Sequence, residues 1–213
     1  MIPAKFDYVK PGSVEEAISA LTEAGEDAKI IAGGQSLLPV LRLRLAAPSL
    51  LVDLGGIAEL KGIRDDGDGI VVGAMTPYFE VIGDNLLQEH VALLVQATQT
   101  VADNQVRHRG TLGGALAHAD PAGDLGAPAL ALEAQMTIAG ASGRRTVSAA
   151  DFFVDYFTTA LGENEILTEI RFPKYTGWGS HYEKFNRTAQ AWWMCAVAAA
   201  VRVDGGTIAE ARV

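Results

Sequence analysis

The sequence predicts an α+β fold with two lobes: a small α/β lobe, followed by a larger, mostly antiparallel lobe with helices. Helical and short apolar patterns alternate over residues 13–54, as in a small α/β unit. Further along the chain, strand patterns flank glycine-rich turns, which is typical of antiparallel hairpins. The chain has 213 residues, of which 49% are hydrophobic, so it can bury a sizeable core in one or two domains.

The first lobe begins with a predicted amphipathic helix. Ser13 and Glu16 form a capping box, and apolar residues then repeat on one helical face as far as Gly25. The lobe is expected to end near the glycine pair at residues 55 and 56. Between these limits the elements predicted are a buried strand at residues 28–32, a helix at 36–45 and a second strand at 50–54.

The second lobe is predicted to contain two hairpins. One joins strands at residues 60–64 and 70–74 through an Asp- and Gly-rich turn, and the other joins 136–139 and 144–147. Thr76 and Pro77 look like a helix cap and the first helical position. The remaining elements predicted are helices at 86–102 and 125–133 and strands at 166–172, 182–185, 196–203 and 207–213.

These patterns predict domains at residues 1–56 (N-terminal α/β lobe), 57–175 (second lobe) and 176–213. The last predicted strand is still running at Val213. Because a free strand without a partner or cap is an unusual end for a chain, we expect a missing C-terminal portion. Residues 176–213 would then be the start of an incomplete, truncated C-terminal domain.

The composition argues against several classes of protein. A formal net charge of −9, with one local basic cluster at residues 107–109, argues against nucleic-acid binding. No run approaches the roughly 18 apolar residues of a membrane span, and the N-terminus lacks a signal-peptide pattern. We therefore expect a cytoplasmic protein, with peripheral attachment to the inner face of the membrane left open. The single cysteine, Cys195, excludes an internal disulfide and an iron–sulfur cluster held by this chain alone.

Two glycine turns carry the strongest functional signal. The first follows a predicted buried strand and reads Ile31-Ala32-Gly33-Gly34-Gln35-Ser36; the second reads Arg109-Gly110-Thr111-Leu112-Gly113-Gly114. Glycine lets backbone N–H groups approach an anion closely, and the start of a helix adds free N–H groups. Two such turns could bind one diphosphate from both sides, which predicts a dinucleotide cofactor. A Rossmann NAD site is disfavoured, because no third glycine follows Gly67 and Gly69 at the required spacing.

A polar cluster at residues 118–124 allows three interpretations. His118, Asp120 and Asp124 could hold a divalent metal for hydrolysis, although no second His or Glu motif accompanies them. Alternatively, Asp120 starts a turn and Asp124 caps the following helix. In the third interpretation, Asp124 accepts a hydrogen bond from a cofactor sugar hydroxyl or ring group, and the flanking glycines favour this one.

The other reactive or aromatic side chains are most simply explained by structural roles. Lys184 lies in a predicted strand, where lysine is usually solvated, and Trp192 and Trp193 are typical of a core, although an aromatic ring can also cover a flavin. Cys195 is expected to be a small buried hydrophobe in an apolar run. With no G-x-S-x-G pattern either, nucleophilic catalysis is discarded.

Together these motifs resemble the FAD-binding medium subunit of molybdenum hydroxylases, the xanthine dehydrogenase family. The matching residues are 32–36, 111–114, 117–121 and Asp124, while 105–111 and 163–167 look most like the carbon monoxide dehydrogenase branch. The resemblance covers essentially the whole chain. It is weak for the substrate, because nicotine, aldehyde, purine and aromatic acyl-CoA enzymes use similar flavin subunits.

The resemblance implies a PCMH-type (vanillyl-alcohol-oxidase-like) fold that binds FAD, with both glycine turns on the diphosphate between two lobes. It implies no catalytic side chain and no metal held by this chain. Asp124 would contact the cofactor, Leu167 and Lys184 would line or reach its groove, and Val101 would lie beside the ring. The implied cofactor-binding residues are Ile31, Ala32, Gly33, Gly34, Gln35, Ser36, Leu37, Val101, Thr111, Leu112, Gly113, Gly114, Ala115, Asp124, Leu167 and Lys184.

Two residues depart from the commonest carbon monoxide dehydrogenase form: Gln35 stands where His is frequent, and Leu112 where Ile is frequent. Gln35 can still donate a hydrogen bond but cannot become cationic. Whether Trp192 or Trp193 covers the flavin stays open, and so do two rival functions: a divalent-metal hydrolase and a non-redox assembly module.

The resemblance also implies partners and an electron path. They are a large molybdopterin-containing subunit and a small [2Fe-2S] subunit, in a dimer of heterotrimers. Electrons would pass from the iron–sulfur clusters to the FAD of this chain and on to an external acceptor. The rest of the family's C-terminal domain, which is expected to start at residue 176, would follow residue 213.

Overall fold

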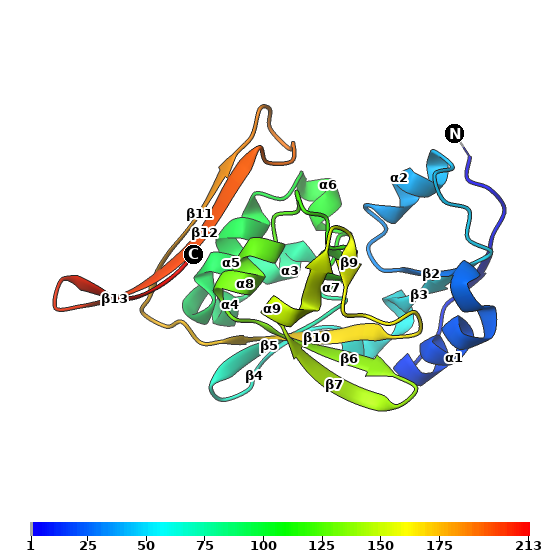
Figure 1. The fold of residues 1–213 in the computed structure, drawn as a ribbon, viewed down its shortest axis with the longest axis horizontal. Helices are drawn as coiled ribbons and strands as arrows, with labels where there is room; N and C mark the ends of the chain where they lie inside the picture. The colour runs from blue at the N-terminus through cyan, green and yellow to red at the C-terminus, as the bar shows by residue number, and fades with distance from the viewer. Residues whose placement is uncertain (1) are drawn as a thin grey trace.

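The computed structural model describes residues 2–213. The first lobe is built on a small parallel sheet of strand order β1-β3-β2, seen at the right of Figure 1. Its strands are β1 (Asp7–Val9), β2 (Ala28–Ile31) and β3 (Leu50–Asp53). Its helices are α1 (Val14–Ala24), α2 (Leu37–Arg42) and the 3-10 turns Gly25–Asp27 and Leu54–Gly56; a further 3-10 turn, Ala58–Leu60, leads into the second lobe.

The predicted cap of α1 is confirmed, with one difference in its partners. The Ser13 hydroxyl accepts a hydrogen bond from the Glu16 amide at 3.1 Å. The Glu16 carboxylate accepts from the amide of Gly12 at 2.8 Å rather than from that of Ser13. The helix then buries Val14, Leu21 and the apolar side chains between them against the sheet.

The second lobe is an antiparallel sheet covered by helices on one face, the upper face in Figure 1. The strand order is β4 (Ile63–Asp65), β5 (Gly69–Gly73), β10 (Ile166–Pro173), β6 (Gln135–Gly140) and β7 (Gly143–Ser148). The helices are α3 (Tyr78–Gly83), α4 (Asn85–His90), α5 (Ala92–Gln99), α6 (Asn104–Arg107), α7 (Leu112–His118), α8 (Gly126–Ala131) and α9 (Ala149–Phe152).

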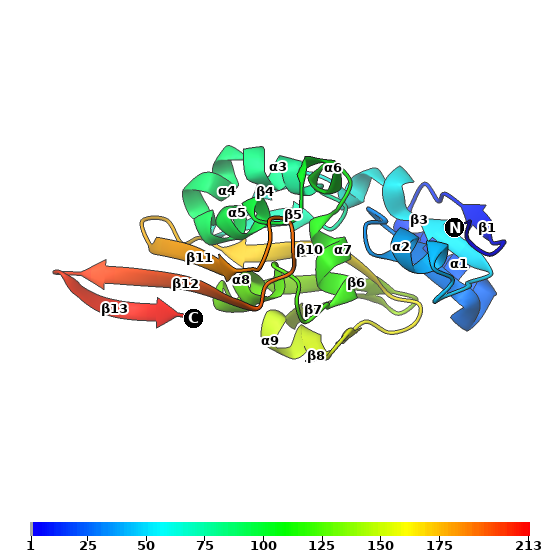
Figure 2. The ribbon, with the colours of Figure 1, turned by 90° about the horizontal axis from the view of Figure 1, so that it is seen from above.

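A third sheet follows and extends beyond the body of the molecule, as Figure 2 shows. It is antiparallel, in the order β11 (Gly179–Phe185), β12 (Cys195–Asp204) and β13 (Thr207–Arg212). Its inner end packs on the second lobe, because Tyr182, Ala198 and Ala200 are buried in that lobe's core. A short hairpin of β8 (Phe153–Asp155) and β9 (Thr158–Thr159) completes the fold.

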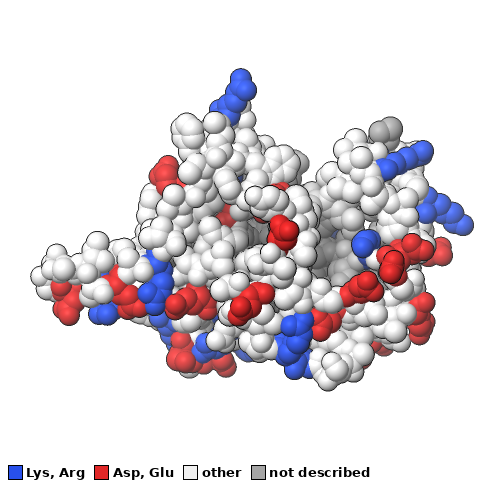
Figure 3. Space-filling view, in the orientation of Figure 1, with Lys and Arg blue, Asp and Glu red and all other residues white. Residues whose placement is uncertain are grey.

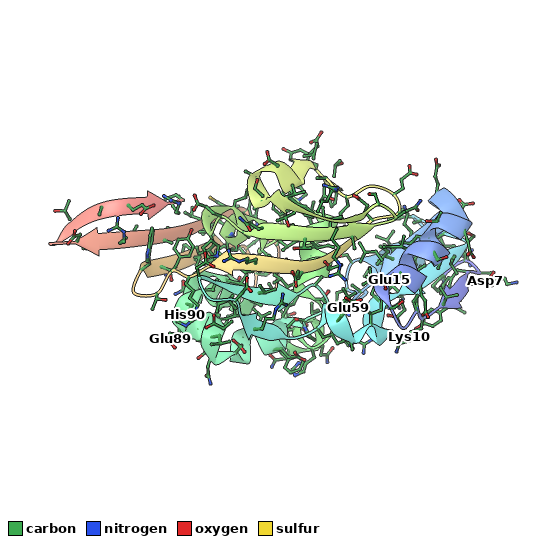
Figure 4. The ribbon with its side chains drawn as sticks, turned by 90° about the horizontal axis from the view of Figure 1, so that it is seen from below. Asp7, Lys10, Glu15, Glu59, Glu89 and His90 are labelled. Carbon is green, nitrogen blue, oxygen red and sulfur yellow. The ribbon has the colours of Figure 1, made fainter. Side chains whose placement is uncertain are left out.

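The first two lobes share buried side chains. The smaller of two apolar clusters joins Val14 and Leu21 of α1 to Met75 and Ile166 of the second lobe. Close to this junction in the chain, Glu59, labelled in Figure 4, forms an ion pair of 2.7 Å with Arg144 on β7. The two lobes are therefore joined by a shared apolar cluster.

Several sequence predictions were wrong in detail. The single helix at 86–102 is divided into α4 and α5 at Val91, whose φ and ψ of −138° and 40° are not helical. Thr76 is not a cap: its hydroxyl bonds the backbone of Gly62, and Pro77 takes the N-cap position of α3. Cys195 is exposed rather than buried. The last two predicted strands do pair, as β12 and β13.

Short elements were missed altogether. Strand β1 and the β8–β9 hairpin have three or fewer residues per strand, too few to show a periodicity. None of the helices within residues 2–213 is long and apolar enough to cross a membrane.

Candidate functional site

A cleft of about 830 Å³ runs between the first and second lobes. Figure 3 shows the surface hollowed at this place, between the first lobe at the right and the rest of the molecule. Its volume falls within the roughly 300–1,000 Å³ typical of ligand and cofactor sites. Both glycine turns line the cleft, as do residues from the second lobe and the third sheet.

The two glycine turns touch each other across the cleft. A Cβ atom added to Gly33 would lie 2.2 Å from the carbonyl oxygen of Arg109 and 2.7 Å from the Cα of Gly110. Only glycine permits this approach of two backbones. The expectation that residues 33–34 and 113–114 share one cleft is therefore confirmed.

The first turn presents free backbone donors. Within residues 2–213, the amides of Gly33, Gly34, Gln35 and Ser36 donate to no other group. Gly34 has a φ of +72°, which glycine adopts at little cost. The Gln35 side chain donates to the carbonyl of Gly33 at 3.1 Å and so folds back on its own turn. Four successive free N–H groups form a concavity suited to an anion.

The second turn differs from the first, because most of its amides donate within the protein. The amide of Leu112 donates to the carbonyl of Thr76 at 3.0 Å, and that of Gly113 to the carbonyl of Ala74 at 2.9 Å. The amide of Gly114 donates to the Thr111 hydroxyl at 3.2 Å. These bonds tie α7 to the end of β5 and leave few donors for a ligand.

Glycine at position 113 is needed for this packing. A Cβ added to Gly113 would lie 2.4 Å from the Cβ of Ala74 and 2.7 Å from its carbonyl oxygen. At the same turn, Thr111 still faces the cleft: its amide has no acceptor within residues 2–213, and its hydroxyl proton remains available. The second turn thus offers a ligand the amide and the hydroxyl of Thr111, and not several successive amides.

A buried ion pair forms part of the second-lobe wall. Lys184 Nζ on β11 lies 2.9 Å from Asp124 Oδ2, and the two side chains are only 6% and 8% exposed. Lys184 also donates to the carbonyl of Thr100 at 3.2 Å, and the Tyr182 hydroxyl donates to Asp124 Oδ1 at 2.9 Å. Lys184 is thus not a solvated strand residue. This cluster fastens the third sheet to the second lobe at the cleft.

Asp124 does not cap a helix, because α8 has Leu125 at its N-cap and no side-chain cap bond. Asp120 does start the predicted turn, since its carboxylate accepts from the amide of Ala122 at 2.9 Å. The metal-hydrolase alternative is contradicted: no group of three His, Cys, Asp or Glu side chains in residues 2–213 is arranged to hold a metal. The carboxylate of Asp124 is instead committed to Lys184 and Tyr182.

Most of the predicted site residues line the cleft. The two exceptions are Ile31, at the end of β2, and Leu112, which is fully buried at the start of α7. The residues that the structure brings together there are Ala32, Gly33, Gly34, Gln35, Ser36, Leu37, Val101, Thr111, Gly113, Gly114, Ala115, Asp124, Leu167 and Lys184.

The sequence did not point to several other lining residues. Tyr78 and Phe157 line the cleft, and Phe157 packs beside His118 with ring centroids 5.2 Å apart. Neither Tyr78 nor Phe157 belongs to a motif with a recognisable spacing. Of the two tryptophans that the sequence left open as covers of a flavin, Trp192 lines the cleft and is 70% exposed, whereas Trp193 donates its ring N–H to the carbonyl of Gly123 at 3.3 Å.

Two tyrosines near Asp124 have raised pKa values. Burial is the larger cause for both, and the negative charge of Asp124 adds to it. For Tyr182, the hydrogen bond to Asp124 also raises the pKa. Both hydroxyls therefore stay protonated and remain hydrogen-bond donors at neutral pH.

The residues present fit a dinucleotide cofactor. The free amides of the first turn and the donors of Thr111 can hold a diphosphate, and the cleft extends on both sides of them. The first lobe contributes Leu21, Lys29 and Ile30 to its lining, and the second lobe and the segment after it contribute Asp124, Lys184 and Trp192.

Comparisons with known proteins agree with this geometry. The family described as FAD binding domain in molybdopterin dehydrogenase matches residues 4–175. The carbon monoxide dehydrogenase medium chain of Hydrogenophaga pseudoflava is 44% identical over the whole of this chain and 75% of its own length. The glyceraldehyde dehydrogenase medium chain of Sulfolobus acidocaldarius is 37% identical over 99% of this chain and 74% of its own.

Solved structures show the same similarity. One is the carbon monoxide dehydrogenase of Hydrogenophaga pseudoflava lacking the Mo-pyranopterin moiety, with a TM-score of 0.97 over 99% of this chain and 74% of that chain. Another is quinoline 2-oxidoreductase from Pseudomonas putida 86, 37% identical, with a TM-score of 0.94 over 99% and 73%. The predicted α+β FAD-binding fold is therefore confirmed, and the chain belongs to the family of FAD-binding domains of molybdopterin dehydrogenases.

Proposed function

We propose that the chain is the FAD-binding electron-transfer subunit of a molybdenum hydroxylase. It would take electrons from iron–sulfur clusters on a partner subunit and pass them to an external acceptor. The observation that carries the proposal is the contact between Gly33 and the backbone of Arg109 and Gly110 beside the free amides of the first turn. This contact creates one cleft with donors for a diphosphate at its middle.

The bound flavin would supply the redox chemistry, and this chain would bind and orient it and exclude water. The amides of residues 33–36, with Thr111, would hold the diphosphate. The flavin-bearing half would lie toward Trp192, whose ring can stack on another aromatic system, and toward the polar cluster of Asp124 and Lys184. The adenosine half would extend toward Lys29.

The carbon monoxide dehydrogenase type is the first choice for the whole enzyme. Medium chains with this name, from Hydrogenophaga pseudoflava and Afipia carboxidovorans, are 44% and 39% identical to the chain. Aldehyde, nicotine and purine enzymes remain the alternatives, because medium subunits with such names are 35–37% identical. The substrate would bind to a different polypeptide.

The proposed partners follow from the similarity to medium subunits of such enzymes, and the single cysteine agrees with it, because it cannot ligate a cluster alone. They are a small [2Fe-2S] subunit and a large molybdopterin-containing subunit, in a dimer of heterotrimers within the cytoplasm. Within the chain we propose the boundaries 1–56, 57–175 and 176–213, with the third segment contributing Tyr182 and Lys184 to the site.

The test is a visible absorption spectrum and flavin quantification of the purified chain after incubation with FAD and removal of excess ligand. We expect about one FAD per chain. Copurification with a molybdopterin-containing subunit and a cysteine-rich subunit would support the assembly. A chain that folds but retains no flavin would overturn the proposed function and favour the non-redox assembly module.

A further inference from the structure

Tyr78 is a buried residue whose polar end has no partner in the protein. It is the first residue of α3 and is only 7% exposed. Its backbone amide donates to the carbonyl of Gly110 at 3.0 Å, but its hydroxyl makes no hydrogen bond within residues 2–213. The side chain lines the cleft, and its hydroxyl oxygen is not sealed from it. The hydroxyl is thus a polar group that is open to the cleft and available to a ligand there.

The neighbouring polar groups do not supply the missing partner. Asp124 is near enough to raise the pKa of Tyr78, after the larger effect of burial, yet it does not bond the hydroxyl. Its two oxygens accept from Tyr182 and from Lys184 instead. Tyr182, the other tyrosine of this region, is thus satisfied by the protein, whereas Tyr78 is not.

The ring of Tyr78 is held firmly in place. A Cβ added to Gly110 would lie 2.5 Å from the Tyr78 ring, so the second glycine turn packs directly against this ring. Pro77 precedes it and forms an isolated bridge with Thr111. A donor fixed in this way loses little conformational freedom when a ligand binds.

We propose that the Tyr78 hydroxyl is a further cofactor-binding group, which donates a hydrogen bond to the flavin-bearing half of the dinucleotide. The inference rests on the proposed function, since it assumes FAD in this cleft. The Tyr78 hydroxyl would be a fixed, neutral hydrogen-bond donor near Asp124, on the wall of the cleft opposite the first glycine turn. Tyr78 would then position the flavin half, while the free amides bind the diphosphate.

The test compares the binding of FAD, FMN and ADP to the wild-type chain and to Tyr78→Phe, which removes only the oxygen. Titration calorimetry or flavin fluorescence gives the dissociation constants. We expect those for FAD and FMN to rise about five- to tenfold, as for the loss of one hydrogen bond, and that for ADP to stay within twofold. The melting temperature of the ligand-free chain should not fall.

Tyr175→Phe is the matched control, because the Tyr175 hydroxyl faces Glu133 at 3.4 Å and does not line the cleft. Unchanged FAD affinity in Tyr78→Phe, or an equal loss for ADP, would overturn the role of Tyr78. Both outcomes leave the proposed function intact, provided that the wild-type chain binds FAD. Failure of the wild-type chain to bind FAD would instead overturn the proposed function.

Discussion

Four consecutive amides at the first glycine turn, Gly33 to Ser36, donate to nothing else in the protein, whereas at the second turn the amides of residues 112–114 all donate internally. The first wall of the cleft therefore offers donors to a ligand. The second wall, formed by α7, Tyr78 and the Asp124–Lys184 pair, is packed and largely satisfied. The Gly-Gly dipeptide thus has two physical roles, at residues 33–34 and at 113–114. Substitutions on the first wall should mainly change ligand affinity, and those on the second wall should mainly change stability.

The largest expected effect is on the second wall, in Lys184→Met. The substitution keeps the length of the side chain but leaves the carboxylate of Asp124 buried without its cation. Breaking a buried ion pair from one side costs about 3–5 kcal/mol of unfolding free energy. Urea denaturation of the ligand-free chain measures this loss.

Lys174→Met is the matched control for that variant, because Lys174 pairs with Asp65 at the surface, where Asp65 is 46% exposed. An exposed pair contributes about 0–1 kcal/mol. Equal losses in the two variants would mean that the second wall is not the tightly held structure described here.

A smaller loss of stability is expected for Gly113→Ala. The new methyl group would meet Ala74 at 2.4 Å and push α7 away from β5. Overpacking of this kind costs about 1–3 kcal/mol, which thermal unfolding would detect. Gly83→Ala serves as the control, since nothing lies within 4 Å of its added Cβ, and it should unfold no earlier than the wild type. A stable Gly113→Ala chain would remove the distinction between the two turns.

On the first wall, Gly33→Ala should change ligand affinity more than stability. Its methyl group would force the two turns apart at Arg109, while the shared core at Met75 and Ile166 still joins the lobes. We expect the FAD dissociation constant to rise at least tenfold, about 1.4 kcal/mol. Gly126→Ala, whose added Cβ meets only Phe153 at 3.9 Å, should bind FAD as the wild type does. Wild-type affinity in Gly33→Ala would contradict the assignment of the first wall to the ligand.

Much of the local structure, and the location of the site, could be predicted from short sequence patterns. Helix α1, the strands of both hairpins and the two glycine turns follow from capping, periodicity and turn chemistry, all of which act over a few residues. The resemblance of the two turns to a known family also predicted the cofactor. Strands as short as β1 and β8 have too few residues to show an alternating pattern, so they were not predicted.

How the groups at the site are used depends instead on contacts between segments that lie far apart in the sequence. Whether an amide is free depends on acceptors far along the chain, such as the carbonyl of Ala74 for Gly113, and no local pattern records them. The burial of Lys184 follows from its pairing with Asp124 across two elements, and the Tyr78 ring is placed at the cleft by packing on Gly110 of the second turn. Hydrogen-bond satisfaction and burial are properties of distant surfaces brought together, so they exist only in the folded chain.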